Sequence, residues 1–365
     1  MNPPSDRSAV GAPSAESRPA LHRVGDLGAQ LGRGGGASRR GRYALGFGLA
    51  ALIFGFLVWT VASQWSELRR AQVGFDGWWL VPGVGLVGLF YVLMGYGWDL
   101  VLRFLGYELA PARAQMVWGQ SLLARYVPGS VLFVLGRVLL AEREGVPRRA
   151  TLASVVYELG LQFAAAAMVA SYFFVDHPDL QDQPVRWAVL VIVPAALVGF
   201  HPRVFGPIAD GILRRLGRDP LPSVMPFRGV AVMLVFFAVV WVVIGVGLFF
   251  VGRAIFPLEA SVLPTLAAAQ SVAFIAAVLT VVTPSGLGVR DGAFAWAAAV
   301  AVPGGFAVAA AIAIASRLVM TVVELVYVGV VSALGRRAGL DLHHEPVDAP
   351  APDRSADAER VAPGR

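Results

Sequence analysis

Residues 125–145 read RYVPGSVLFVLGRVLLAEREG. The apolar run in this stretch is interrupted by Pro128-Gly129, and arginines stand at positions 125 and 137. Proline breaks a helix because its nitrogen has no hydrogen to donate and its ring clashes with the preceding turn. Inside a membrane, non-helical backbone is tolerated only where protein buries it or where it lines a cavity. The stretch therefore predicts two half-helices that meet at a break within a membrane protein.

The composition of the whole chain supports a membrane class. Hydrophobic residues make up 57% and charged residues 15% of the sequence, against about 45–50% and about 25% in soluble domains. The apolar residues form eight blocks: Tyr43–Trp65, Trp79–Phe104, Met116–Ala141, Ala150–Val175, Trp187–Phe200, Val230–Val251, Ser261–Val282 and Phe306–Leu334. Most reach the roughly 20 residues of a spanning helix. We predict an all-α polytopic membrane protein, because backbone groups in lipid must bond internally.

Several classes of soluble function do not fit the sequence. It has no cysteine, which excludes disulfides and thiolate metal sites. Gly286, Gly288 and Gly292 lack the spacing of a dinucleotide loop, and no P-loop is visible. The net charge of +6 suits anionic lipid headgroups rather than nucleic acid. We therefore expect no enzyme activity, no cofactor, no metal and no nucleic-acid partner.

Polar composition and arginine placement predict the domains and their orientation. Residues 1–42 and 338–365 are rich in small and polar residues and are expected to be disordered tails, which leaves 43–337 as the transmembrane domain. The connections 142–150 and 201–229 are basic, whereas 175–186 is mainly acidic. Because cytoplasmic loops carry the excess of arginine, we expect a plasma-membrane protein with both connections and both termini in the cytoplasm.

Counting the crossings predicts two re-entrant segments. The block around Pro128-Gly129 must begin and end in the cytoplasm, so it should enter, break and return. Residues 280–294, TVVTPSGLGVRDGAF, contain a second break in the other half. Six spanning helices plus two broken segments would form an inverted repeat, in which interrupted segments mark a transport site. Gln120-Ser121 and Gln270-Ser271 precede the two breaks. Eight plain crossings would give the same terminal orientation.

Each break is a candidate anion site. A half-helix that starts there points its positive end into the protein and suits a phosphate or a carboxylate. Ser130 and Asp291 are candidate caps for the restarting helices. Arg125, Arg137 and Arg290 lie near the breaks, and a guanidinium fork fits phosphate. Alternatively, Arg125 and Arg137 extend to the cytoplasmic headgroups.

Charged residues within the apolar blocks form a second group of candidates. Glu158, Arg317 and Glu324 lie inside blocks, where a charge is costly and normally faces a cavity or a partner. Arg317 is near the middle of its block, so we expect it to pair with Glu158 or Asp291. Glu158 or Glu324 could carry a proton, or these pairs could be purely structural.

The two broken segments resemble the membrane region of lysylphosphatidylglycerol synthases, a flippase-like family. The resemblance rests on a YxPG…GR segment, a following helix with a glutamate, and a later PxGxGxR segment: Tyr126, Pro128, Gly129, Gly136, Arg137, Glu158, Pro284, Gly286, Gly288 and Arg290. It covers about residues 43–337. Asp291 stands where the family usually has glutamate, and the family's cytosolic aminoacyltransferase domain is missing.

The resemblance implies lipid translocation rather than lysyl transfer. We expect the protein to translocate or bind an anionic lipid or a polyprenyl-phosphate-linked amphiphile. The expected substrate-binding residues are Arg125, Tyr126, Pro128, Gly129, Arg137, Glu158, Pro284, Gly286, Gly288, Arg290, Asp291, Arg317 and Glu324. The alternative is a membrane partner of a glycosyltransferase or lipid-modifying enzyme that does not itself transport.

Overall fold

The computed structural model describes residues 76–123, 131–176, 182–183, 185–215, 217, 219–221, 223–279 and 288–337. These residues form helices and no strand: η1 (Gly77–Trp79), α4 (Leu80–Phe104), α5 (Pro111–Leu122), α6 (Val131–Arg143), α7 (Arg148–Asp176), α8 (Val185–Gly199), α9 (Pro202–Arg215), α10 (Phe227–Ile255), η4 (Ala260–Val262), α11 (Leu263–Leu279), α12 (Val289–Ala298) and α13 (Gly305–Arg337). The first apolar block and both predicted tails lie outside the described residues, so the predicted domain boundaries remain predictions.

The predicted class is confirmed in the described part of the chain. Five helical stretches are long and apolar enough to cross a membrane, and the bent pair α8–α9 could make a sixth. The five are Gly77–Phe104, Arg148–Val175, Phe227–Ile255, Ala260–Leu279 and Gly305–Gly335. The protein is therefore an all-α polytopic membrane protein.

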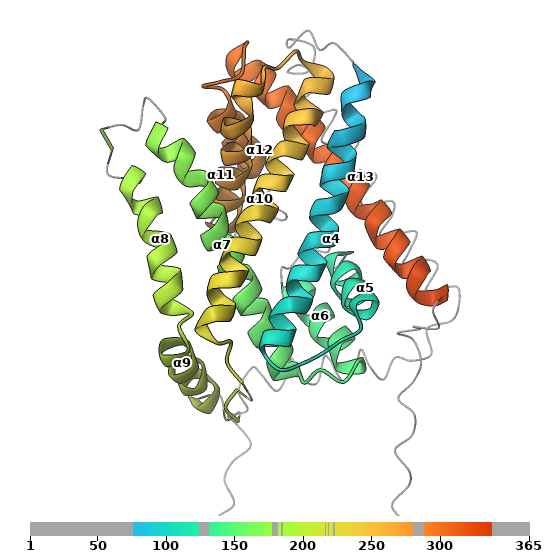
Figure 1. The fold of residues 1–365 in the computed structure, drawn as a ribbon, viewed down its shortest axis with the longest axis vertical. Helices are drawn as coiled ribbons and strands as arrows, with labels where there is room; N and C mark the ends of the chain where they lie inside the picture. The colour runs from blue at the N-terminus through green and yellow to red at the C-terminus, as the bar shows by residue number, and fades with distance from the viewer. Residues whose placement is uncertain are drawn as a thin grey trace, which may run out of the picture. The chain divides into compact units, whose positions relative to one another are not determined.

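Helices α4 and α10 run antiparallel and define two sides of the bundle. The Asp76 amide before α4 donates to the Ala254 carbonyl at the end of α10, over 2.7 Å. At the other end, a methyl group on Gly229 would lie 2.9 Å from the Phe104 ring. We call the end where α4 finishes and α10 begins the α9 side, and the opposite end the α12 side (Figure 1).

Helices α5 and α6 form the first re-entrant hairpin. They have 12 and 13 residues and pack against one another, and at 1.5 Å per residue neither spans the roughly 30 Å of hydrocarbon. Arg113 near the start of α5 forms an ion pair of 3.1 Å with Glu144, just after α6. The segment therefore enters and leaves on the same side, as predicted. The break residues Pro128 and Gly129 lie outside the described residues.

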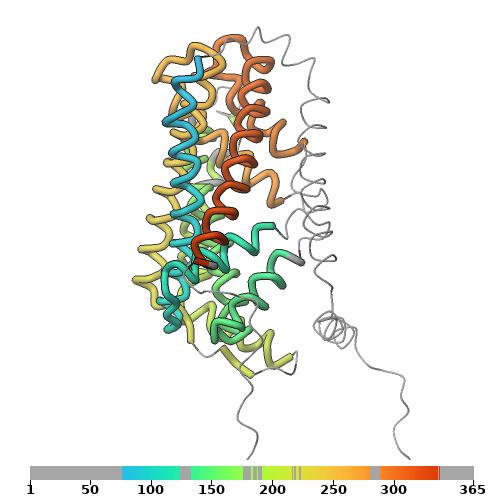
Figure 2. The backbone as a smooth tube through the Cα atoms, turned by 90° about the vertical axis from the view of Figure 1, so that its right-hand side faces the viewer, coloured from blue at the N-terminus to red at the C-terminus, as the bar shows by residue number. Residues whose placement is uncertain are grey.

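Helices α11 and α12 form the second hairpin, from the α12 side. The two helices pack together. Helix α11 with the preceding η4 is long enough to cross a membrane, whereas α12 has only 10 residues and is too short. Trp296 near the end of α12 makes an edge-to-face contact of 5.1 Å with Phe173, which lies near the end of α7. Figure 2 shows the green α6 in the lower part of the bundle and the orange α12 in the upper part. The second break, within 280–287, lies outside the described residues.

The packing of the two halves follows an inverted repeat. Exchanging α4, α5, α6 and α7 for α10, α11, α12 and α13 maps each helix contact onto another observed contact. Thus α4–α5 corresponds to α10–α11, α6–α7 to α12–α13, and α5–α13 to α11–α7, while α4–α10 maps onto itself. Because the hairpins enter from opposite sides, the two halves have opposite orientation, as the sequence analysis predicted.

A repeat in the sequence accompanies this symmetry, and the sequence analysis noticed only its Gln-Ser dipeptide. Several residues recur 150 positions later without a gap: Gly95 and Gly245, Gly97 and Gly247, Arg103 and Arg253, Gln120 and Gln270, Ser121 and Ser271. They run from the second half of one long helix to the first arm of the following hairpin. This constant offset is a signal within the sequence itself, and it supports the inverted repeat independently of the helix packing.

The predicted relation between the connecting loops is also confirmed. Arg149 at the start of α7 donates to the Pro220 carbonyl over 3.2 Å, so the connections 142–150 and 201–229 share the α9 side. Helix α7 ends on the opposite side (Figure 1). That the α9 side faces the cytoplasm remains a prediction.

We expect Gly245→Ala to lower the free energy of unfolding by about 1–3 kcal/mol, as overpacking does. A Cβ atom at this position of α10 would lie 2.5 Å from the Cα atom of Ala267 in α11, where backbone rather than a flexible side chain must move. Gly85→Ala is the control, because no atom lies within 4 Å of its added Cβ. Thermal unfolding in detergent measures both, and equal midpoints would contradict the prediction.

Candidate functional site

Arg137 lies inside the protein at the centre of the first hairpin's second arm. Its side chain is 0% exposed. The guanidinium carbon is 4.5 Å from the ring centre of Phe133, 5.5 Å from that of Trp98 and 5.8 Å from that of Trp118. Cation–π attraction operates within about 6 Å. The alternative that Arg137 extends to the headgroups is therefore wrong, because α4, α5 and α7 enclose it.

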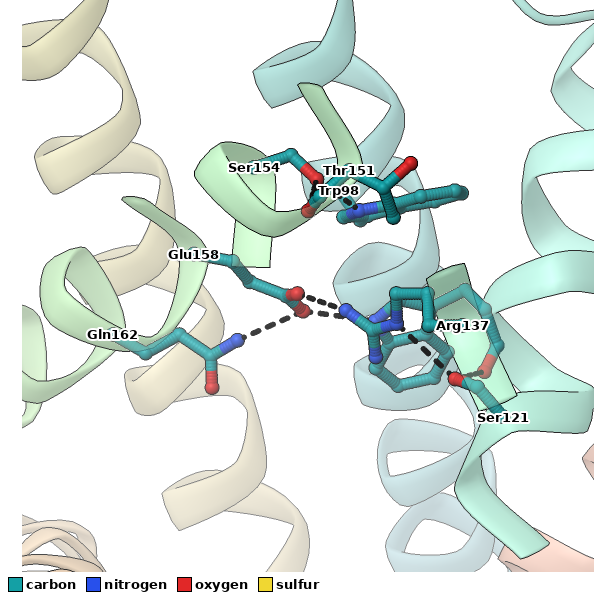
Figure 3. Close-up of polar contacts among 8 residues, drawn as sticks. Trp98, Ser121, Arg137, Thr151, Ser154, Glu158 and Gln162 are labelled. Atoms are coloured by element: carbon teal, nitrogen blue, oxygen red, sulfur yellow. Dashed lines mark hydrogen bonds and ion pairs between the residues drawn. The ribbon is translucent and has the colours of Figure 1, made fainter. Parts of the chain in front are cut away.

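Glu158 in α7 is the ionic partner of Arg137. The Arg137 Nη1 atom pairs with Oε2 of Glu158, and both side chains are buried. Oε1 of Glu158 accepts hydrogen bonds from Trp118 at 2.8 Å and from Gln162 at 3.1 Å. Arg137 also donates from Nε to Ser121 at 3.1 Å, on the side away from Glu158 (Figure 3). Buried charges are stable only when paired and hydrogen-bonded in this way.

One nitrogen of the Arg137 guanidinium is left without an acceptor in the described part of the chain. Its Nη2 atom is buried and finds no hydrogen-bond acceptor among the described residues. A guanidinium carries five N–H donors in a fixed fork and no acceptor. The site therefore holds a cation that Glu158 neutralises and that keeps one nitrogen without an acceptor among the described residues.

The second hairpin carries a second buried ion pair. Arg317 in α13 pairs with Asp291 in α12, with side chains 8% and 11% exposed. This confirms the prediction that Arg317 faces the bundle interior and meets a carboxylate. Of the two expected partners, Asp291 is the one found, because Glu158 is held by Arg137.

The expectation that Asp291 caps α12 is wrong. Gly288 occupies the cap position with a φ of +79° and no side-chain hydrogen bond. Asp291 lies inside the first turn, where a negative charge still interacts favourably with the helix dipole. Its carboxylate reaches Arg317 on α13 instead of the amides at its own helix start.

Arg290 in α12 and Glu324 in α13 lie next to this second pair. The Nη2 atom of Arg290 is 3.1 Å from the sulfur of Met320. Glu324, one turn further on, accepts a hydrogen bond of 2.9 Å from the Tyr91 hydroxyl of α4. Tyr91 stacks on Tyr327 with ring centres 5.8 Å apart. These contacts join α12, α13 and α4 through polar groups.

The two ion pairs occupy equivalent places with opposite polarity. One joins α6 to α7 and the other joins α12 to α13, helix pairs that the inverted repeat exchanges. In the first pair the arginine is on the hairpin, and in the second pair the carboxylate is on the hairpin.

Within the described ranges, no group of three or more histidine, aspartate or glutamate side chains could hold a metal ion.

Comparison with known families agrees with this geometry. Residues 43–327 match the family described as the lysylphosphatidylglycerol synthase TM region. The chain belongs to this family. A comparison with curated proteins finds no match. Membership in a transmembrane family, together with the apolar helices, makes this a multi-pass membrane protein.

The structure gathers part of the residue set that was expected to bind substrate. Six of these residues lie outside the described part: Arg125, Tyr126, Pro128, Gly129, Pro284 and Gly286. The described ones fall into two groups, Arg137 with Glu158 on the first hairpin, and Gly288, Arg290, Asp291, Arg317 and Glu324 at the second. Whether they bind substrate remains a prediction.

Residues that complete the first group were missed by the sequence analysis. Ser121 was noticed only as part of a repeated dipeptide, although it accepts from Arg137. Gln162 follows Glu158 by four residues, a spacing that places both on one helix face and could have indicated the contact. Trp98 and Trp118 gave no local signal, because their rings approach Arg137 from other helices.

Proposed function

We propose that this protein translocates an anionic lipid or a polyprenyl-phosphate-linked amphiphile between the leaflets of the plasma membrane, without covalent chemistry. The observation that carries the proposal is Arg137, a fully buried arginine on a re-entrant hairpin with one donor nitrogen unused. A buried charge costs free energy in a membrane protein, so its presence within a membrane segment points to a functional site.

The chemistry of the two hairpins supports an anionic headgroup. Arginine binds phosphate through a planar fork whose charge does not change with pH. Arg137 lies on the first hairpin and Arg290 on the second, so each half of the inverted repeat contributes a guanidinium to its hairpin. Interrupted segments of this kind line substrate sites in transporters built from inverted repeats. The lipid is proposed to move down its own gradient or in exchange for the movement of an ion. Both termini of the protein are proposed to lie in the cytoplasm.

The proposal predicts that replacing either arginine slows lipid movement. The purified protein in liposomes should expose a fluorescent phosphatidylglycerol of the inner leaflet to a membrane-impermeant quencher. Arg137→Ala and Arg290→Ala should each slow this exposure about ten-fold or more. A hydrogen bond to a charged group contributes about 1.5–3 kcal/mol, and about 1.4 kcal/mol in a barrier is a factor of ten.

The matched control is Arg148→Ala, which removes an arginine whose side chain is 63% exposed and paired with Glu142. Its rate should equal that of the unchanged protein. Rates are compared per folded protein, judged by size-exclusion profile, because Arg137→Ala removes a buried charge. If the unchanged protein moves lipid no faster than empty liposomes in several lipid mixtures, the non-transporting partner role replaces translocation.

A further inference from the structure

Helix α9 is an element that neither the ion pairs nor the inverted repeat explains. It spans Pro202–Arg215 and is bent by 66° from the preceding helical stretch Val191–Gly199. The helix begins at Pro202, and proline is favoured at the first position of a helix. His201, just before it, accepts a hydrogen bond from the Arg203 amide through Nδ1 at 3.2 Å. Residues 201–229 were predicted only as a basic connection, so this helix was missed.

Helix α9 stays on one side of the bundle. The ring of His201, just before α9, is 5.2 Å from the ring of Phe227, the first residue of α10. Asp210 in the middle of α9 accepts the Leu221 amide at 2.8 Å, so the returning connection also lies beside the helix. The chain therefore reaches this side through α8 and starts back through α10 from the same place, as Figure 1 shows.

One face of α9 is held by the protein. The Phe205 ring lies 4.4 Å from Tyr157 in α7 and 5.7 Å from Phe200, measured between ring centres. Gly206 beside it is buried. These contacts fix the position of the helix at the end of α7 and α8.

The apolar face of α9 continues beyond Phe205 and is largely uncovered there. Ile208 and Ile212 follow Phe205 by three and seven residues, about one and two turns, so they extend the same apolar stripe. They are 57% and 54% exposed. The described part of the chain therefore leaves more than half of each residue uncovered.

The opposite face of α9 is basic. Arg203, Arg214 and Arg215 are exposed, and Arg215 lies about 100° around the helix from Arg214, beside Ile208. Arg203 and Arg214 are eleven residues apart, about three turns, so they share a face. Ile208 is five residues from Arg203, about 140° around the helix.

We propose that α9 lies in the membrane interface and docks on the headgroups of anionic phospholipids. Short helices with an apolar face and an arginine-rich face bind in this way, with the apolar side among the acyl chains and the charges at the phosphates. Charge complementarity selects anionic over zwitterionic lipid. Because Phe205 fixes α9 to Tyr157, the helix concentrates anionic lipid beside α7 and α8. This inference does not depend on lipid translocation.

The placement of α9 can be tested directly, because the natural chain has no cysteine. Ile212→Cys and Arg214→Cys introduce single labelling sites two residues apart on opposite faces. Each is spin-labelled in vesicles of three parts phosphatidylcholine to one part phosphatidylglycerol. The label at 212 should be more accessible to oxygen dissolved in lipid, and the label at 214 to a water-soluble nickel complex. Equal access of both labels to nickel, or protection of both, overturns the proposal.

The lipid preference has its own test. Energy transfer from a fluorophore on an Ala209→Cys variant to labelled phosphatidylglycerol or labelled phosphatidylcholine measures which lipid gathers at α9. The combined Arg203→Gln, Arg214→Gln and Arg215→Gln changes should reduce the preference for phosphatidylglycerol, by up to about five-fold per arginine.

The control for the lipid preference is Arg113→Gln. It removes the charge of an arginine in α5 that pairs with Glu144, and Figure 1 shows α5 apart from α9. The transfer should stay unchanged. Equal transfer to both lipids in the unchanged protein, or a preference that survives loss of the three arginines, overturns the proposal.

Discussion

Glu158→Gln is expected to lower the free energy of unfolding by about 3–5 kcal/mol, the usual cost of stranding one partner of a buried ion pair. The glutamine keeps the shape of the side chain and an oxygen for Trp118 and Gln162, so the change removes little except the charge. Arg137 is then left fully buried with Ser121 as its remaining hydrogen-bond acceptor among the described residues.

Arg137→Met should cost less than Glu158→Gln, although it breaks the same ion pair. After this change Glu158 still accepts from Trp118 and Gln162. A carboxylate can also be neutralised by one proton, whereas a guanidinium stays charged. Methionine fills the space between the aromatic rings, and sulfur makes favourable contacts with such rings.

The double variant Arg137→Met/Glu158→Gln separates stability from function. It leaves no unpaired charge, so most of the stability lost in Glu158→Gln should return, as it does when buried ion pairs are replaced as a unit. Lipid movement should not return, because the guanidinium is absent. Thermal unfolding in detergent and the liposome assay provide the two measurements. Recovery of lipid movement in the double variant would show that the pair is purely structural.

Much of the architecture could be predicted because it depends on local chemistry. Pro128-Gly129 indicates a broken helix wherever the chain folds, and the arginines of 142–150 and 201–229 indicate loops on one side. Together they predicted that the apolar block around Pro128-Gly129 enters and leaves the membrane on one side. The Arg113–Glu144 contact confirms this. Arg317 was predictable for a similar reason, since a charge near the middle of a long apolar helix needs a partner.

The remaining features depend on contacts between distant parts of the chain. The sequence predicted that Arg317 pairs with either Glu158 or Asp291. Asp291 is the partner because α12 packs on α13, while α6 packs on α7 and brings Arg137 to Glu158. The rings of Trp98 and Trp118 around Arg137 come from two further helices. Helix α9 was missed because its 14 residues carry four charges and fall below any criterion for a spanning helix.

The inverted repeat makes the two ion pairs a matched comparison, because their helix surroundings correspond while their charges are exchanged. Arg137 and Glu158 both lie within the body of their helices. Asp291 lies in the first turn of α12, where the positive end of the helix dipole contributes about 0.3–1 kcal/mol to a negative charge. Replacing Asp291 should therefore lower the free energy of unfolding by more than replacing Arg317, because only Asp291 also interacts with the helix dipole.

We expect Arg317→Met to lower the free energy of unfolding by about 3 kcal/mol, at the lower end of the range for a broken buried pair. The stranded Asp291 keeps the stabilising field of the α12 start, and its side chain is 11% exposed. Asp291→Asn removes both the ion pair and the favourable dipole interaction. The double variant Asp291→Asn/Arg317→Met should recover most of the loss, as in the first hairpin, but not the dipole contribution.

Thermal unfolding of these three variants beside Arg148→Met tests the expectation. Arg148 forms a pair in which the arginine is 63% and Glu142 42% exposed, and such surface pairs contribute about 0–1 kcal/mol. The order of losses should be Arg317→Met well above the double variant, with Arg148→Met smallest. If Arg317→Met unfolds like Arg148→Met, the Arg317–Asp291 pair does not hold α12 on α13, and the second hairpin needs another explanation for its position.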